Sequence, residues 1–252
     1  MIQPGIYPNI PDSEYRSLPY LSQSLLGQFK RSMRHGQEAM LNPTEPTSAM
    51  ILGKALHTAI LEPTVFKTLY VSGPAGDART KAYKASLAEL RNGGNEVLSA
   101  GDFDRVTTMT DSSLSKSSVQ SILSIGSAEL SIVWDDPVTL VRCKGRLDWF
   151  NSDLAGGTIV DIKTTRDASA GAFERSIYSY GYHRQAAFYL AGAKVLGMPA
   201  KHFVFIAIES EPPYEVAVYR LMEAAIEYGE LEIRNLLLEI AKCQKTGIWP
   251  GY

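Results

Sequence analysis

A predicted β-hairpin at residues 145–165 is the feature that most constrains this chain. Its sequence, GRLDWFNSDLAGGTIVDIKTT, consists of two short apolar segments joined by a turn-rich stretch, NSDLAGG, and this pattern predicts two paired strands. Asp148 and Asp161 lie near the strand ends, and Lys163 follows two residues after the second aspartate. Because burying unpaired charge is expensive, a hairpin with a buried inner face needs something that compensates these charges.

The pattern of the whole chain places this hairpin in a mixed α/β fold. Before Gly126 the apolar residues recur at helical spacing, whereas the segments after it are β-branched and alternating, as strands of one sheet would be. The expected strands are AELSIVWDD, VTLVRCKGRLDWF, TIVDIKT, KHFVFIAIES and YEVAVYRL, with helices at 168–178, 182–196 and 222–246. This order predicts an α/β fold with a mixed central sheet flanked by helices.

The first 125 residues are expected to add helices to that core. Residues 1–20 read as extended, Ser22 is expected to cap a helix over QSLLGQFKRSMRHG, and AMILGKALHTAILEP is apolar nearly all round and therefore predicts a buried helix. VSGPAGDARTKAY reads as a polar loop before a charged helix that ends near Asn92, and helical patterns with a serine-rich interruption continue through 102–125. We expect one domain over 1–252, with a helical part at about 20–125, a sheet core at about 126–220 and a C-terminal helix at about 221–246.

Composition excludes several classes of protein. The chain has 252 residues, 45% of them hydrophobic, which is enough for one large domain with a core. A net charge of −2 argues against a broadly basic protein that coats nucleic acid, although an enzyme that binds nucleic acid through a local site stays possible. Cys143 and Cys243 form no Cys-x-x-Cys pair, so a disulfide scaffold, an iron–sulfur cluster or a cysteine zinc site is not expected. The N-terminus has no signal-like apolar region and no segment reaches a membrane-spanning length, so we expect a soluble, cytoplasmic protein.

A divalent cation would compensate the two aspartates of the hairpin. Mg²⁺ prefers hard oxygen ligands and is usually held by one or two carboxylates together with substrate phosphate oxygens. A protonated lysine cannot be a ligand, but it can orient an attacking water or neutralise charge that develops on a phosphate. The combination of Asp148, Asp161 and Lys163 therefore makes chemical sense around a phosphodiester.

Two simpler interpretations of this stretch stay open. A (D/E)-x-K tripeptide arises by chance about once in a chain of this composition, and Asp148 with Lys163 could be a cross-strand ion pair worth about 0.2–1 kcal/mol. The strand alternation, however, puts Asp161 and Lys163 on the same face, and Asp148 ends the preceding strand. This arrangement favours an active site.

These residues resemble the signature of the PD-(D/E)XK nuclease superfamily, in which an acidic residue ends one strand and (D/E)-x-K lies on the next. The resemblance implies the restriction-endonuclease-like core, with a mixed central sheet flanked by helices. Two further segments are similar to the RecB-like branch. One is GKALHTAILE, with Gly53, His57, Ile60, Leu61 and Glu62; in that branch the helix histidine helps to bind the metal. The other is a Q-x-x-x-Y helix, here Gln185 and Tyr189, which borders the metal site.

The resemblance narrows to RecE-type exonucleases of phages and prophages. YPNIPDSEYRSLPYLSQSLLGQF, GKALHTAILEP, DARTKAYKASLAEL, AELSIVWDD, CKGRLDWF, VDIKTT and YHRQAAFYL occur in the order of that family, from about residue 7 to 220. It implies a Mg²⁺-dependent exodeoxyribonuclease, with Mn²⁺ able to substitute, that digests one strand of linear double-stranded DNA from 5′ to 3′. The 3′ overhangs would serve a RecT-like single-strand annealing protein in DNA recombination and repair. Ring-shaped homo-oligomers, typically tetramers, in a bacterial host cytoplasm are also implied.

The resemblance assigns roles to individual residues. His57, Asp148, Asp161 and the Ile162 carbonyl would bind one or two Mg²⁺ ions, and the expected catalytic set is Asp148, Asp161, Lys163, Gln185 and Tyr189. His183 lies outside this pattern, so no site role is assigned to it and it is expected in the core or on the surface.

A protein with net negative charge must concentrate its basic groups to hold DNA. The candidates are Arg79, Lys81 and Lys84 after the glycine-rich loop, ranked first, and Lys30, Arg31 and Arg34 on the first helix; a plain solvated face is the competing explanation. The alternatives to a RecE-type enzyme are a Cas4-like nuclease, an endonuclease of the same superfamily, or a non-catalytic module that binds DNA ends.

Overall fold

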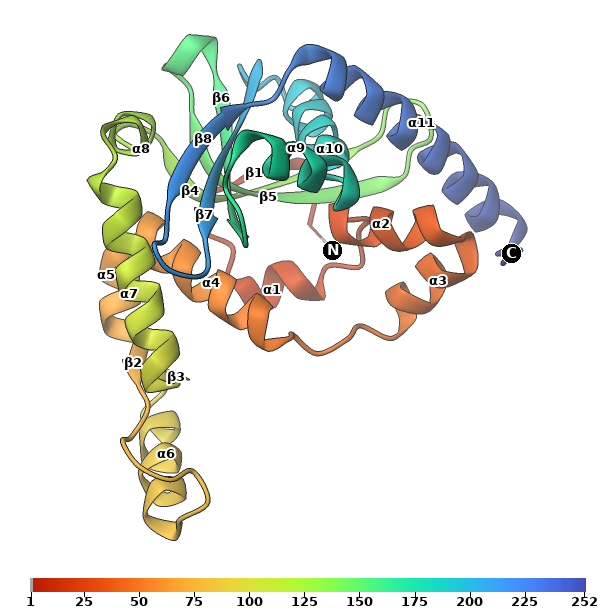
Figure 1. Ribbon diagram of the computed structural model, residues 1–252. Helices are drawn as coiled ribbons and strands as arrows, with labels where there is room; N and C mark the ends of the chain where they lie inside the picture. Colours follow the sequence, from red (N-terminus) through yellow and green to blue (C-terminus); the bar gives the residue numbers. More distant parts are fainter. Residues whose placement is uncertain (1) are drawn as a thin grey trace.

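A six-stranded mixed sheet forms the centre of the structure, a computed structural model in which residues 2–252 are described. The strands follow the order β1-β4-β5-β6-β7-β8 (Figure 1). Their bounds are β1 (Gly5–Tyr7), β4 (Ser127–Asp135), β5 (Arg142–Asn151), β6 (Thr158–Thr165), β7 (His202–Glu209) and β8 (Val216–Arg220). β6 and β7 pair in parallel and the other neighbours are antiparallel. The predicted mixed sheet and its five predicted strands are confirmed.

Helices cover both faces of this sheet. They are α1 (Asp12–Ser17), α2 (Gln23–Arg31), α3 (Met33–Leu41), α4 (Ser48–Leu61), α5 (Pro63–Leu69), α7 (Ala100–Ser115), α8 (Ser117–Ile122), α9 (Ala170–Ser179), α10 (Tyr182–Val195) and α11 (Glu223–Thr246), with a 3₁₀ turn, η1, at Leu154–Gly156. Parallel strands need a crossover connection, and α9 with α10 supplies it between β6 and β7. The order of elements after Gly126 is the predicted one.

Two apolar clusters, one on each face, hold the layers together. Ile159, Phe203 and Phe205 point to the face covered by α2, α10 and α11. Val160 and Ile206, at alternating positions, point to the face covered by α4, α5 and α7. β7 is buried on both faces and is therefore a nearly continuous apolar run, whereas the apolar run of β6 is interrupted by Asp161 and Lys163.

A small arm projects from this body, as Figure 1 shows at the bottom of the view. It contains β2 (Tyr70–Ser72) and β3 (Glu96–Leu98), which pair in parallel, and α6 (Lys81–Asn92). No residue of α6 is buried. The charged helix predicted to end near Asn92 is therefore present, but it lies outside the core.

Three expectations for the N-terminal part need correction. The described part of the segment predicted as extended, residues 2–20, is not merely extended, because it contains β1 and α1. The predicted helix over 23–36 is two helices: the backbone is extended at Ser32, with φ −169° and ψ 161°, and the Ser32 side chain caps α3 by accepting a hydrogen bond from the His35 amide. The apolar helix α4 is buried only in its second half, since Met50 and Ile51 in its first turns are 56% and 47% exposed.

Within residues 2–252, none of the helices combines the length and the apolar character that crossing a membrane requires.

A partly buried ionic cluster joins α2, α10 and α11. The Glu232 carboxylate accepts hydrogen bonds from His183 Nε2 at 2.8 Å and Arg184 Nη1 at 3.0 Å, and it pairs with Lys30. Burial raises the pKa of Glu232, but the hydrogen bonds from these three side chains outweigh burial and bring the pKa to about 2. His183, left open by the sequence, is therefore a core residue, 2% exposed.

Replacing Glu232 with Gln is expected to lower the free energy of unfolding by about 1–2 kcal/mol at pH 7. The folded-state pKa lies below the ordinary 4.5, so the ionic stabilisation is present above that pH and is lost as the pH falls towards 2. Urea denaturation of wild type and variant at pH 7 and at pH 2 measures this difference. Glu230→Gln, at an exposed site on the same helix, is the matched control. A deficit that is undiminished at pH 2 would contradict the ionic origin.

Candidate active site

The sheet opens between β5 and β6, and the candidate site lies in this opening. The two strands pair only where 149–151 face 158–160, and they separate beyond that point. Past the separation the Ile162 amide donates to Asp148 Oδ2 at 2.8 Å, and the Ile162 carbonyl lies 3.0 Å from His57 Nε2. The side chains of Asp148 and His57 thus contact the Ile162 amide and carbonyl, which would otherwise form hydrogen bonds with the backbone of β5.

His57 comes from α4 and joins two expected ligands. Besides the Ile162 contact, its Nδ1 lies 3.4 Å from Asp148 Oδ2. Burial lowers the pKa of His57, but the Asp148 carboxylate outweighs burial and raises the pKa to about 9. In turn His57 offsets the effect of burial on Asp148 and lowers the pKa of that carboxyl. His57, Asp148 and Ile162, far apart in the sequence, are therefore in direct contact.

Asp161 and Lys163 share one face of β6, as the alternation predicted. Asp161 is 2% exposed, its Oδ1 accepts a hydrogen bond from Gln185 Nε2 at 2.6 Å, and its Oδ2 lies 2.5 Å from Lys163 Nζ. The Lys163 ammonium is therefore the partner of Oδ2, an oxygen that is otherwise buried. Burial raises the pKa of Asp161 to about 6 even though Lys163 opposes this shift. Lys163 pairs with Asp161 and not with Asp148, which contradicts the simple cross-strand ion pair.

The electrostatics keep Lys163 protonated. Burial lowers the pKa of this amine, but the carboxylates of Asp161 and Asp148 outweigh burial and raise the pKa above its ordinary value. The ammonium also lies 4.8 Å from the centre of the Tyr182 ring. Lys163 is therefore a fixed cation that can donate hydrogen bonds towards the opening.

Glu129 on β4 is a member of the site that the sequence analysis missed. It lies opposite Asp148, between the pairs Ala128–Trp149 and Leu130–Leu147. Its φ of 49° is in the left-handed region that residues other than glycine seldom adopt, and such backbone conformations cluster at functional sites. Burial, assisted by the Asp148 charge, raises the pKa of Glu129 to about 7. Glu129 belongs to the segment AELSIVWDD, which was predicted as a strand. The strand register that places Glu129 opposite Asp148, however, cannot be derived from the sequence.

The donor set fits a divalent cation. One nitrogen or oxygen atom each from His57, Glu129 and Asp148 lies within 4.8 Å of the other two. The buried Asp161 carboxylate, which pairs with Lys163, is a fourth potential donor, on the neighbouring strand. Carboxylate and carbonyl oxygens with one imidazole suit Mg²⁺ or Mn²⁺, and burial of several acids without a cation would be costly.

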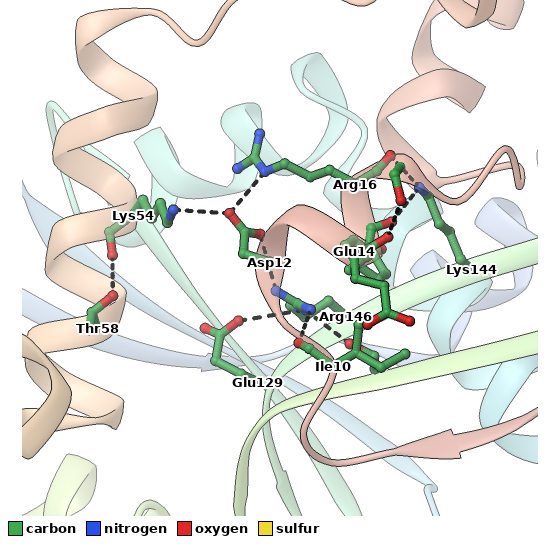
Figure 2. A network of polar contacts seen from close by, with 12 residues as sticks. Ile10, Asp12, Glu14, Arg16, Lys54, Thr58, Glu129, Lys144 and Arg146 are labelled. Carbon is green, nitrogen blue, oxygen red and sulfur yellow. Dashed lines mark hydrogen bonds and ion pairs between the residues drawn. The ribbon is translucent and has the colours of Figure 1, made fainter. Parts of the chain in front are cut away.

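An N-terminal ionic network holds these elements in place (Figure 2). Asp12 on α1 accepts from Arg146 Nη1 at 3.1 Å and from Arg16 Nε at 3.0 Å, and it pairs with Lys54 Nζ at 2.9 Å. Arg146 Nε lies 3.9 Å from Glu129. Lys54 precedes His57 on α4 and Arg146 precedes Asp148 on β5, so Asp12 connects the elements that carry these two ligand candidates, and Arg146 extends the network to Glu129.

Gln185 and Tyr189 both lie on α10, but of the two only Gln185 forms a hydrogen bond with Asp161. Gln185 contacts Asp161 directly, as described above. Tyr189 is 8% exposed and packs on β5 at Gly145, where an added Cβ would lie 2.9 Å from the Tyr189 ring. Gly145 therefore permits the close approach of α10, and Tyr189 lies in the core behind the carboxylates.

The basic candidates lie outside this opening. Arg79 precedes the arm helix α6, on which Lys81 and Lys84 lie, and the Arg79 side chain is 94% exposed. Lys30 pairs with Glu232, and Arg31 Nε donates to the Tyr252 hydroxyl at 3.1 Å. Arg34 lies on α3 and not on the first of the two helices. DNA binding by these six residues stays a prediction.

Comparisons with known proteins bear on this architecture. The model of a family described as "PDDEXK-like domain of unknown function (DUF3799)" matches residues 22–252. The crystal structure of a protein from Eubacterium rectale, described as a "putative exonuclease", covers 93% of this chain and 87% of its own, with a TM-score of 0.62 and 13% identity. The crystal structure of SSO0001 covers 77% of this chain and 87% of its own at 15% identity, but its TM-score of 0.32 is too low to inform the fold. No curated protein matches the chain.

Proposed function

Because the chain belongs to the PDDEXK-like family DUF3799, as the superfamily signature in its sequence predicted, we propose that it is a metal-dependent nuclease. More narrowly, we propose a RecE-type exodeoxyribonuclease that digests one strand of linear duplex DNA from 5′ to 3′ and leaves 3′ overhangs. The observation that carries the proposal is the convergence of His57, Asp148, Asp161 and Lys163 where β5 and β6 separate. The similar structure from Eubacterium rectale is described as a "putative exonuclease", which supports the narrower proposal.

The proposed metal ligands are His57, Glu129, Asp148, Asp161 and the Ile162 carbonyl, for one or two Mg²⁺ ions, with Mn²⁺ able to substitute. A bound cation would supply Lewis-acid stabilisation of the charge that develops on the scissile phosphate. Since His57 is held by Asp148 and Ile162, it must give up a proton from one ring nitrogen before that nitrogen can act as a ligand.

The remaining site residues have proposed roles that follow from their contacts. Lys163, protonated and directed by Asp161, would orient the attacking water and donate to a phosphate oxygen. Gln185 would fix the orientation of the Asp161 carboxylate through its 2.6 Å hydrogen bond. Tyr189, which is buried, would act as a positioning residue that supports Gln185 and Asp161 from the core.

Digestion of end-labelled linear duplex DNA tests the proposal directly. We expect cleavage in Mg²⁺ or Mn²⁺, none in excess EDTA, and release of label from the 5′ end of each strand before the 3′ end. Covalently closed circular duplex of the same sequence should stay intact. Cutting of the circle would favour an endonuclease, and tight binding to DNA ends without cleavage in either metal would favour the non-catalytic module.

The proposed assembly is a cytoplasmic ring of four chains that passes its 3′ overhangs to a RecT-like annealing protein. A ring would give processivity with few DNA contacts in each chain. Light scattering after size exclusion should give about four times the 27.7 kDa chain mass. A stable monomer at working concentration would remove the ring from the proposal and leave the chemistry untouched.

A further inference from the structure

A groove of about 730 Å³ adjoins the proposed active site, and the catalytic roles above do not use it. Its walls are the end of β6, one side of α9, the 179–182 turn and the start of α4. Thr164 and Thr165, which directly follow Lys163 on the catalytic strand, line it. Arg166 comes three residues after Lys163, about 10 Å along an extended chain. The groove therefore begins where the reacting phosphate would lie.

Two arginines give this groove a positive character. Arg166 and Arg175 are exposed and line it, and within the described residues neither makes an ion pair shorter than 4.0 Å with an acid. The acid in the lining, Asp167, is engaged by the Ser169 amide at 2.8 Å. The Ser169 hydrogen bonds lower the pKa of the Asp167 carboxyl, and Arg175 is near enough to lower it further, but no ion pair within residues 2–252 holds either guanidinium, so both can contact an anionic ligand.

Tyrosine rings run from the catalytic lysine into the same groove. The Tyr182 ring lies 4.8 Å from Lys163 Nζ, and its centre is 5.7 Å from that of Tyr180. Tyr180 is 68% exposed, so a face of its ring is available in the groove. Exposed aromatic rings beside basic groups are the combination that holds unpaired nucleic acid, because the bases stack on the rings while the cations contact the phosphates.

We propose that this groove binds single-stranded DNA, namely the few nucleotides that adjoin the scissile phosphate. The proposal rests on the proposed nuclease function. Arg166 and Arg175 contact the phosphates, and Tyr180 stacks on a base. A duplex hides its base faces, so it would gain the phosphate contacts but not the stacking.

Fluorescence anisotropy with a fluorescein-labelled dT12 oligonucleotide, in EDTA so that no cleavage occurs, tests the groove. Arg166→Ala and Arg175→Ala should each weaken binding about 3- to 10-fold at moderate salt and reduce the slope of log K against log[salt] by about 0.7. Tyr180→Ala should weaken binding at least about 5-fold with an unchanged slope, whereas Tyr180→Phe should bind like wild type. Arg234→Ala, at an exposed position on α11, is the matched control.

The outcomes separate this proposal from the nuclease function. If wild type cleaves linear duplex but these variants bind dT12 as wild type does, the groove proposal is overturned and the nuclease function stands. If wild type cleaves nothing while the variants lose dT12 affinity, the groove stands and the nuclease function fails. Equal loss of affinity by Tyr180→Ala for dT12 and for a blunt duplex would overturn the preference for a single strand.

Discussion

Asp161→Asn is expected to lower the rate of DNA cleavage at least about 10³-fold without loss of the fold. Lys163 and Gln185 both contact the Asp161 carboxylate, one at each oxygen, and this buried carboxylate is also a candidate ligand for the cation. The asparagine side chain has nearly the same shape as aspartate but no charge. Both the bound cation and Lys163 therefore lose their anionic partner. The rate of label release from linear duplex measures the effect.

The same variant distinguishes a catalytic role from a structural one. Because the buried Lys163 ammonium loses its anionic partner in Asp161→Asn, the variant should be somewhat less stable than wild type in EDTA, but urea denaturation should still show a cooperatively folded protein under the conditions of the cleavage assay. Asp153→Asn, at an exposed position in the turn of the same hairpin, should leave cleavage unchanged. Wild-type cleavage by purified Asp161→Asn would refute the assignment.

Local periodicity explains why the catalytic strand could be predicted. Side chains in a strand alternate between faces, so Asp161 and Lys163 had to share a face once the apolar run before them was recognised as a strand. The turn-rich NSDLAGG then required Asp148 to come from the neighbouring strand, and the structure pairs the two as an antiparallel hairpin. These inferences need only short-range information.

The separation of β5 from β6 could not be predicted in this way. Pairing ends at Trp149 and Val160, and this early end frees the Ile162 backbone for Asp148 and His57. His57 is 105 residues from Ile162 in sequence, and only the family resemblance suggested that it joins the site. Tertiary packing, not local pattern, brings α4 to this edge.

Register and compensating charge account for the other misses. Glu129 faces Asp148 because of the β4–β5 register, which a strand pattern alone leaves undetermined. Asp12 holds α1 against Arg146 and Lys54, so a short segment with weak helical pattern folds as a helix through long-range ion pairs. In contrast, the exposed charges on α6 make few contacts, and their sequence gives no sign of the arm that carries them.

Glu129→Gln is expected to weaken the binding of Mn²⁺ about 10- to 100-fold. Glu129 lies with His57 and Asp148 in one group of potential ligand atoms, and its backbone has a φ of 49°, in the left-handed region. The amide retains one oxygen but carries no charge, so it is a much weaker ligand for a hard cation. Isothermal titration with Mn²⁺, without DNA, measures the loss independently of cleavage.

Cleavage by Glu129→Gln should fall at low metal concentration and recover in part as Mn²⁺ is raised, because the other ligands remain. Asp161→Asn should not recover in this way, since it also removes the partner of Lys163. Glu14→Gln, which removes an exposed carboxylate from α1 near the ionic network, should leave Mn²⁺ affinity unchanged. If Glu129→Gln binds Mn²⁺ as tightly as wild type, Glu129 is not a ligand, and its contact with Arg146 is then its remaining role.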